Sequence, residues 1–213
     1  MDIKGVITGD VVNSSTIKVD WRKLLIDSIQ QVANELSALS TLKIEFFRGD
    51  SFQLIVDKPE ETLKIAVLLR AGLKSKTPLE SKSIWDARMA IGIGEISYTS
   101  DKIVVSDGEA FHLSGWGLDE IGKRRLTIKT KWDDVNEELK VSTAFADDII
   151  TGWTGSQAQS IYPALLYQTS QKEIAAKYDK SAQNISKLLG AAKESLIRIY
   201  LERYSTLIAK KLM

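Results

Sequence analysis

Two short stretches of the chain place an aspartate directly after a glycine, where a strand-like run ends or turns. Asp10 follows Gly9 in VITGDVVNSS, and Asp50 follows Gly49 in IEFFRGDSFQLIV. Carboxylate oxygens are the ligands that Mg²⁺ and Mn²⁺ prefer, and phosphate groups commonly complete such sites. Two such ions can activate an attacking hydroxyl and stabilise the leaving oxygen in phosphoryl chemistry. Held side by side, Asp10 and Asp50 would therefore provide a site for Mg²⁺ or Mn²⁺ and a nucleotide.

Simpler roles are open for the same residues. Asp50 could be a plain turn residue and Asp10 a cap at a strand end, although favoured two-residue hairpin loops read Asn-Gly or Asp-Gly rather than Gly-Asp. Asn13 and Ser14 could approach a phosphate through side-chain donors and through backbone N–H groups at the start of the next helix. They could equally serve only as caps of that helix.

Alternating strand-like and helix-like patterns over the first 130 residues would bring the two aspartates together. Strands are expected at 3–8, 41–47, 52–57, 87–97, 102–105 and 125–130, and helices at 20–39, 59–73 and 109–121. The first six elements follow the order β-α-β-β-α-β, which is typical of the ferredoxin-like, split-βαβ unit of the α+β class, with an antiparallel sheet and helices on one face. In that sheet the first and third strands are neighbours, so the end of the first meets the turn before the third.

The stretch GDVVNSS, followed about 40 residues later by RGDSFQLIV, resembles the palm-type nucleotide cyclases of the class III and GGDEF families. RMAIGIGEI and DGEAFHLSGWGLDEIG are similar to the strand and helix that come later in those proteins. The resemblance covers about residues 1–130 and implies a cyclase-type palm whose metal ligands are Asp10 and Asp50. The candidate nucleotide contacts are Asn13, Ser14, Arg48 and Gly49.

The chain departs from the cyclase pattern at positions that matter for turnover. Aligned on Gly108, the resemblance puts His112 at the transition-state Asn and Trp116 at the transition-state Arg. Tryptophan carries no charge, and losing an arginine of that kind can cost on the order of 10³–10⁵ in rate. Phe46 stands where the resemblance implies a base-reading Lys. The palm is therefore expected to bind nucleotide or metal with little turnover.

A second candidate site lies near the C-terminus, in QKEIAAKYDKSAQNISKLL. Ser170 with Glu173 three residues later predicts a capping box at the start of a short helix. A turn at 179–180 and a second cap at Ser181 lead into a longer helix, which is the spacing of a helix-turn-helix. The stretch closely resembles bacterial helix-turn-helix regulators of the EIA-x-x-L-x-[IK]-S type.

This second resemblance implies contacts to DNA. Ser181, Gln183, Asn184 and Lys187 would face the major groove, where amide side chains suit base edges. Lys180 would contact phosphate. The alternative is a helical hairpin used for dimerisation, with its polar residues merely solvated.

The charge distribution favours DNA. Residues 157–213 hold nine Lys and Arg against four Asp and Glu, a net charge of +5, whereas the chain as a whole carries +1 and the preceding part therefore −4. The last segment, 194–213, has the pattern of an amphipathic helix, expected in the core or in a homodimer contact.

Composition sets the remaining expectations. The 213 residues are 44% hydrophobic and 27% charged, as in ordinary soluble proteins, and no cysteine is present for disulfides or thiolate metal sites. Neither a signal peptide nor a membrane span is expected, and a cytoplasmic location fits. We expect a palm domain at 1–130, a connecting segment at 131–156 and an all-α helix-turn-helix module at 157–213. This arrangement is similar to the bacterial SatD-like family.

Two functions follow as hypotheses. In the first, the chain is a DNA-binding transcriptional regulator whose palm senses a nucleotide, such as a nucleoside triphosphate or a cyclic nucleotide, together with a divalent metal. In the second, it is a nucleotidyl cyclase or polymerase-like enzyme that makes a cyclic nucleotide and carries a fused helix-turn-helix.

Overall fold

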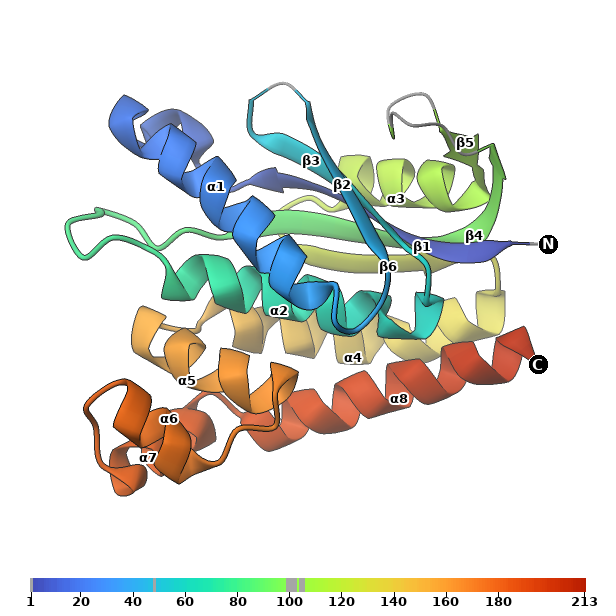
Figure 1. The fold of residues 1–213 in the computed structure, drawn as a ribbon. Coiled ribbons are helices and arrows are strands. Elements are labelled where there is room, and N and C mark those ends of the chain that lie inside the picture. Colours follow the sequence, from blue (N-terminus) through green and yellow to red (C-terminus); the bar gives the residue numbers. More distant parts are fainter. Residues whose placement is uncertain (1, 48, 99–102, 104–105) are drawn as a thin grey trace.

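The described residues, 2–47, 49–98, 103 and 106–213 of a computed structural model, form a six-stranded sheet with helices on both faces (Figure 1). The strands are β1 (Ile3–Val11), β2 (Leu42–Phe47), β3 (Ser51–Val56), β4 (Ala87–Tyr98), β5 (Asp107–Gly108) and β6 (Leu126–Thr130). Their order is β2-β3-β1-β4-β5, with β6 paired to β4. β6 runs parallel to β4, whereas the other neighbouring strands in the described part of the chain are antiparallel.

The helices of the sheet-forming part are α1 (Val19–Leu36), α2 (Thr62–Ser75), α3 (Glu109–Glu120) and α4 (Asp133–Thr151), with short 3₁₀ turns η1 (Ser14–Thr16) and η2 (Pro59–Glu61). The C-terminal helices are α5 (Gly155–Leu166), α6 (Gln171–Lys177), α7 (Ala182–Ala191) and α8 (Glu194–Leu212). None of the helices in the described ranges combines the length and the apolar character needed to cross a membrane.

Alternation along β1 separates the two faces of the sheet. Ile7 is fully buried in the large core that includes residues of α1 and α2. Its neighbour Thr8 points to the other face, where its hydroxyl lies 2.8 Å from that of Ser114 on α3. At Gly92 on β4 a Cβ would come within 2.1 Å of the Ala110 carbonyl oxygen, so α3 lies on the sheet at a distance that only glycine allows.

The predicted mixture of helices and strands is confirmed, and so is the adjacency of the first and third strands. The predicted strand at 102–105 lies outside the described residues except for residue 103. The segment expected as a connection, 131–156, differs most from expectation: it contains the 19-residue helix α4, which packs against β6. The sequence predicts a helix only over KWDDVNEELK, residues 131–140. The buried stripe of α4 continues beyond that stretch and consists of Val135, Leu139, Ala146 and Ile150.

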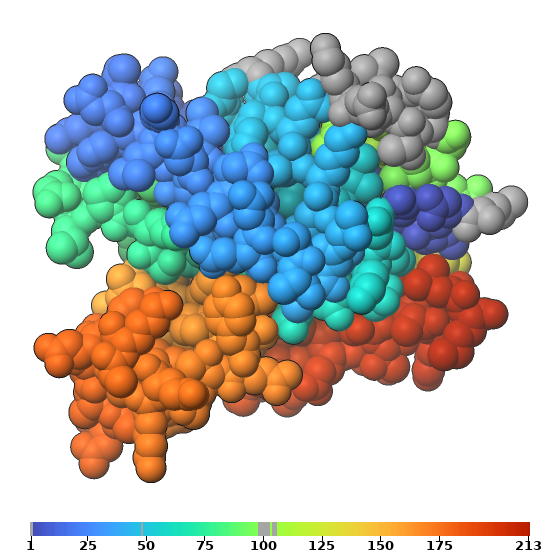
Figure 2. Space-filling view, viewed as in Figure 1, coloured from blue at the N-terminus to red at the C-terminus, as the bar shows by residue number. Residues whose placement is uncertain are grey.

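The C-terminal helices share one hydrophobic core with the sheet-forming part. α5 packs against α2, and the Tyr204 hydroxyl on α8 donates to the Pro59 carbonyl at 2.9 Å. In the space-filling view the orange C-terminal residues lie directly against blue and green residues of the sheet-forming part (Figure 2). The boundaries predicted for a palm and a separate module stay a prediction, but residues 157–213 do not form a core of their own.

A buried ionic cluster connects α2, α4 and the start of β4; we call Arg70, Lys74, Asp86, Arg125 and Asp147 the Arg70 cluster. Arg70 donates to both carboxylate oxygens of Asp86 at 2.8 Å and to Asp147 at 2.7 Å, and its side chain is fully buried. Lys74 Nζ and Arg125 Nη1 also lie within 3.2 Å of Asp86. Burial opposes ionisation of Asp86, but Arg70, Lys74 and Arg125 outweigh it and lower the pKa of Asp86 to about 2.

Replacing Asp86 by Asn is expected to destabilise the fold by about 3–5 kcal/mol, because it leaves buried cations without their counter-ion. Urea unfolding at neutral pH measures this. Lys129→Met, which breaks an exposed pair with Glu120, should cost at most about 1 kcal/mol.

The pH dependence gives an independent check on the same residue. Since folding lowers the pKa of Asp86, its contribution to the free energy of unfolding is full above about pH 4 and is lost as the pH falls through about 2. An Asp86→Asn protein as stable as Lys129→Met would contradict the role given to the cluster.

Candidate functional site

The tip of the β2–β3 hairpin lies beside the end of β1. Asp10 pairs with Ser51 across the two strands, and the Val11 amide donates to the Asp50 carbonyl at 3.1 Å. Gly49 turns the chain with a φ of +80°, in the left-handed region that glycine adopts without a steric penalty. The backbone segments that carry Asp10 and Asp50 are therefore joined directly, as expected.

A hydroxyl from the segment after β1 holds the Asp50 carboxylate. Ser14 Oγ donates to Asp50 Oδ2 at 2.5 Å. Ser14 begins η1, and the preceding Asn13 has a φ of 54°, a left-handed conformation that asparagine tolerates better than most residues. Asn13 makes no side-chain cap, so its contribution here is the turn that brings Ser14 to the hairpin.

A cleft of about 410 Å³ lies between the hairpin tip and the start of α1, within the size range of small-molecule sites. Its lining residues are Ser14, Ser15, Arg22, Leu25, Ile26, Gly49 and Asp50. Two predicted nucleotide contacts, Ser14 and Gly49, thus share the cleft with Asp50. Asn13 lines a neighbouring cleft of about 240 Å³ instead, and Arg48 lies outside the described residues.

Arg22 adds a guanidinium to the cleft that the sequence did not single out. It lies in the first turns of α1, and its side chain is exposed. On the polar side of an amphipathic helix an arginine is usually only solvated, so the periodicity carries no signal for it. The hairpin tip, distant in sequence, is what makes Arg22 part of a site.

The carboxylate of Asp10 is bound by Arg88, which lies directly opposite on β4. Arg88 donates to it from Nε at 2.9 Å and from Nη2 at 2.6 Å, and this hydrogen bonding raises the pKa of Arg88. Asp10 is not among the described residues that line the 410 Å³ cleft. Over the described ranges no group of three or more acidic or histidine side chains is arranged to hold a metal ion.

These contacts make the residues present a poor fit for a resident Mg²⁺ or Mn²⁺. Both oxygens of Asp10 are engaged by a cation, and Asp50 accepts from Ser14. A metal site with Asp10 and Asp50 as its ligands stays a prediction, and these contacts do not favour it.

A row of polar side chains connects the hairpin to α3. Gln53 on β3 donates to Thr8 Oγ1 at 2.9 Å, and Thr8 contacts Ser114. On the outer side of α3 the rings of His112 and Trp116 stack with centroids 5.8 Å apart. Neither ring is among the described residues of the cleft, so the structure does not bring them to Ser14 and Asp50.

The second candidate site is formed by α6, a short turn and α7. Ser170 forms the predicted capping box with Glu173, and Ser181 caps α7 by accepting from the Asn184 amide at 3.1 Å. Ile174 and Ala175 of α6 are buried, as are Ile185 and Leu189 of α7.

The opposite side of α7 is polar and open to solvent. Ser181, Gln183, Asn184 and Lys187 are exposed, and Lys180 in the turn is half-buried. The Lys180 amide donates to the Ala175 carbonyl at 2.9 Å, which holds the turn against α6. The five residues predicted to contact DNA thus lie on the turn and on the solvent side of α7.

Comparison with known proteins does not identify a family or a function for this chain. A scan against family models found no match, and a search of curated proteins found none either. Among solved structures, the chain is similar to a bacterial light-regulated adenylyl cyclase, with 10% identity and a TM-score of 0.46 over 59% of this chain and 74% of that one. At this level of similarity, function has to be inferred from the residues of this chain.

Proposed function

We propose that this chain is a DNA-binding regulator with a nucleotide-binding, ferredoxin-like palm and a C-terminal helix-turn-helix. The observation that supports it most is the solvent-exposed face of α7, where Gln183, Asn184 and Lys187 follow the Ser181 cap. A recognition helix needs such a face, with its N-terminal residues free to enter the major groove and its other side anchored in the core.

The chemistry of this face suits DNA. Asn and Gln amides can form paired hydrogen bonds to adenine edges, and lysines can neutralise phosphates. The excess of positive charge in residues 157–213 would attract the duplex before specific contacts form.

The palm is proposed to bind a nucleoside triphosphate or a cyclic nucleotide in the 410 Å³ cleft. The Ser14 and Ser15 hydroxyls, the Arg22 guanidinium and the backbone at Gly49 line it together. Such groups suit phosphate oxygens, while Leu25 and Ile26 offer an apolar wall.

A second candidate function is nucleotidyl cyclisation, favoured by the direct backbone contact between Val11 and Asp50 that brings the two aspartate-bearing segments together. Against it stands the exposed Trp116, because an indole cannot stabilise charge on a transferring phosphoryl group.

The regulator is proposed to act as a homodimer through an apolar stripe on α4 and α8. Val141 and Phe145 of α4 are 63% and 70% exposed, and Leu196 and Ile199 of α8 are 54% and 62% exposed. Large exposed side chains gathered on one surface mark contact sites more often than scattered ones do.

One ion pair shows that these side chains share a surface. Glu138 of α4 and Arg203 of α8 lie 2.8 Å apart, so the two helices run side by side at this point. Val141 and Phe145 lie three and seven residues after Glu138, and Ile199 and Leu196 lie four and seven before Arg203. Those spacings put all four side chains on the same side of their helices as the ion pair.

Charge complementarity favours a second copy as the occupant. α4 carries six acidic residues and one lysine, whereas α8 carries four basic and two acidic residues. A two-fold axis through the stripe can place α4 of one copy against α8 of the other, so that unlike charges meet. Two recognition helices about 34–36 Å apart would then reach successive major grooves.

For DNA binding, Asn184→Ala is expected to relax sequence preference at a cost of ~1–3 kcal/mol, because a base-edge contact is lost. Lys180→Ala should weaken all sequences alike and reduce the log–log salt slope by about one phosphate equivalent, roughly 0.9. Selection from random duplexes, followed by polarisation titrations at several salt concentrations, measures both. Lys4→Ala in β1 is the control, and full-length protein without salt-sensitive DNA binding would refute the regulator.

For nucleotide binding, Arg22→Ala is expected to weaken binding of a fluorescent triphosphate by about tenfold, the usual weight of a charge-assisted contact. Lys23→Ala is the matched control, since Lys23 is an exposed neighbour that is not part of the described cleft lining. Mass spectrometry of the same mixtures, with Mg²⁺ or Mn²⁺ added, should show no cyclic product. Robust product that Asp50→Asn abolishes would instead establish the cyclase.

For assembly, Phe145→Asp is expected to convert a dimer to a monomer, since it buries a charge in the apolar stripe. Sedimentation velocity measures the mass. Leu79→Asp is the control, because Leu79 is fully exposed and is not part of α4 or α8. The apolar stripe would not be a dimer interface if the wild-type chain sediments as a monomer, or if the Phe145→Asp variant still sediments as a dimer.

A further inference from the structure

At the end of β1, Arg88 forms an ion pair with Asp10 and so holds a permanent positive charge in a fixed position beside the carboxylate. Arg88 contacts both oxygens of Asp10, in the fork-to-fork arrangement that gives Arg–carboxylate pairs their directionality. The two residues are partners in register on adjacent strands, so their backbones hold them opposite one another. Their side chains are 42% and 21% exposed, so one side of the guanidinium is open to solvent.

A divalent ion at this position would meet two obstacles. It would lie beside a permanently charged guanidinium, which repels it, or it would have to displace two charge-assisted hydrogen bonds. The second carboxylate of the proposed pair, Asp50, is itself bound to Ser14.

We propose that the Arg88 guanidinium takes the place of the metal ion at Asp10, so that the palm binds phosphate-bearing ligands without a divalent cation. This rests on the nucleotide-binding function proposed above and specifies its electrostatics. A guanidinium has five N–H donors, of which two are directed at Asp10. Arg88 is outside the described lining of the 410 Å³ cleft, so its part in the proposal is to neutralise Asp10 in place of a metal ion, and not to contact the phosphate itself.

Removal of the arginine from an ordinary surface ion pair would have a different result from the one this proposal predicts. Exposed pairs contribute little to stability, and removing the cation from one creates no new binding site. If Arg88 occupies a latent cation site, its removal frees the Asp10 carboxylate beside the segment that carries Asp50. A hard divalent ion should then bind where none bound before.

The test measures Mn²⁺ binding to the full-length chain without nucleotide. Binding is detected in electron paramagnetic resonance as a loss of the signal of the free ion. The wild type should bind Mn²⁺ weakly, and Arg88→Ala should bind it about tenfold or more tightly, since a positive charge at contact distance is removed. Asp10→Asn combined with Arg88→Ala should abolish the gain. Arg88→Gln, which keeps a donor for Asp10 but not the charge, gives a second reading if the alanine variant folds poorly.

Tight Mn²⁺ binding by the wild type that is lost in Asp10→Asn would overturn the proposal. Arg88 variants whose Mn²⁺ affinity is no higher than that of the wild type would overturn it too. A second arm compares binding of the fluorescent triphosphate in EDTA and in Mg²⁺. Equal affinity supports the proposal, and strict dependence on Mg²⁺ overturns it. Absence of nucleotide binding in both conditions would refute the nucleotide function, while the Mn²⁺ experiment would still decide the role of Arg88.

Discussion

The need to compensate Arg70, a fully buried cation, constrains much of this molecule. A charge without contact to water must be matched by counter-ions and hydrogen bonds, and Asp86 and Asp147 provide them from the start of β4 and from α4. Asp86 in turn precedes Ala87, which begins β4, and its carbonyl accepts from the Val12 amide at 2.9 Å. The same residue that neutralises Arg70 thus fixes the end of β1 and, two positions later, Arg88. The geometry of the candidate site therefore depends on a buried ion pair that is not part of the described cleft lining.

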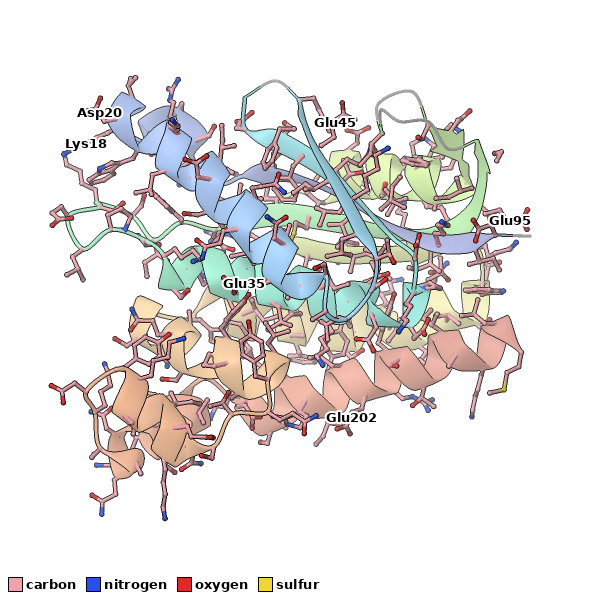
Figure 3. All side chains as sticks on the ribbon, viewed as in Figure 1. Lys18, Asp20, Glu35, Glu45, Glu95 and Glu202 are labelled. Atoms are coloured by element: carbon pink, nitrogen blue, oxygen red, sulfur yellow. The ribbon has the colours of Figure 1, made fainter. Side chains whose placement is uncertain are left out.

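A second constraint comes from the core shared by the sheet-forming part and the C-terminal helices. α1 begins at the cleft, where Arg22 lines it, and ends near α5 (Figure 1). There Glu35, labelled in Figure 3, accepts from the Tyr162 hydroxyl at 2.7 Å. Burial and the neighbouring Glu35 raise the pKa of Tyr162, so this phenol remains a donor across the physiological range. α1 thus runs from the cleft to α5, and α5 packs in turn against α6 and α7.

The features that could be predicted from the sequence are those set by local pattern. Alternation located the β2–β3 hairpin, and serines followed by a polar residue at the right spacing located the starts of α6 and α7. The full length of α4 was missed because its buried stripe continues through a stretch that ends in turn-like glycines. The Arg70 cluster was invisible, since its members are far apart in the chain and charged residues in amphipathic helices are usually solvated. Arg88 could have been found: once β1 and β4 are antiparallel neighbours, the first residues of ARMAIGIG face the last of VITGDV.

The proposed replacement of a metal ion by the Arg88 guanidinium would also limit what the palm could do with a nucleotide. A divalent ion binds phosphate and also lowers the pKa of a coordinated hydroxyl, which is how it produces a nucleophile at neutral pH. An arginine can neutralise a phosphate and orient it through its forked donors, but it offers no coordination position to an attacking oxygen and remains protonated throughout. With Arg88 bound to Asp10 and an uncharged Trp116 on α3, the proposed nucleotide site would hold a phosphate in the cleft rather than transfer it. Recognition without turnover would suit the regulatory palm proposed above, because a ligand that persists can keep α1 and the helices packed against it in one arrangement.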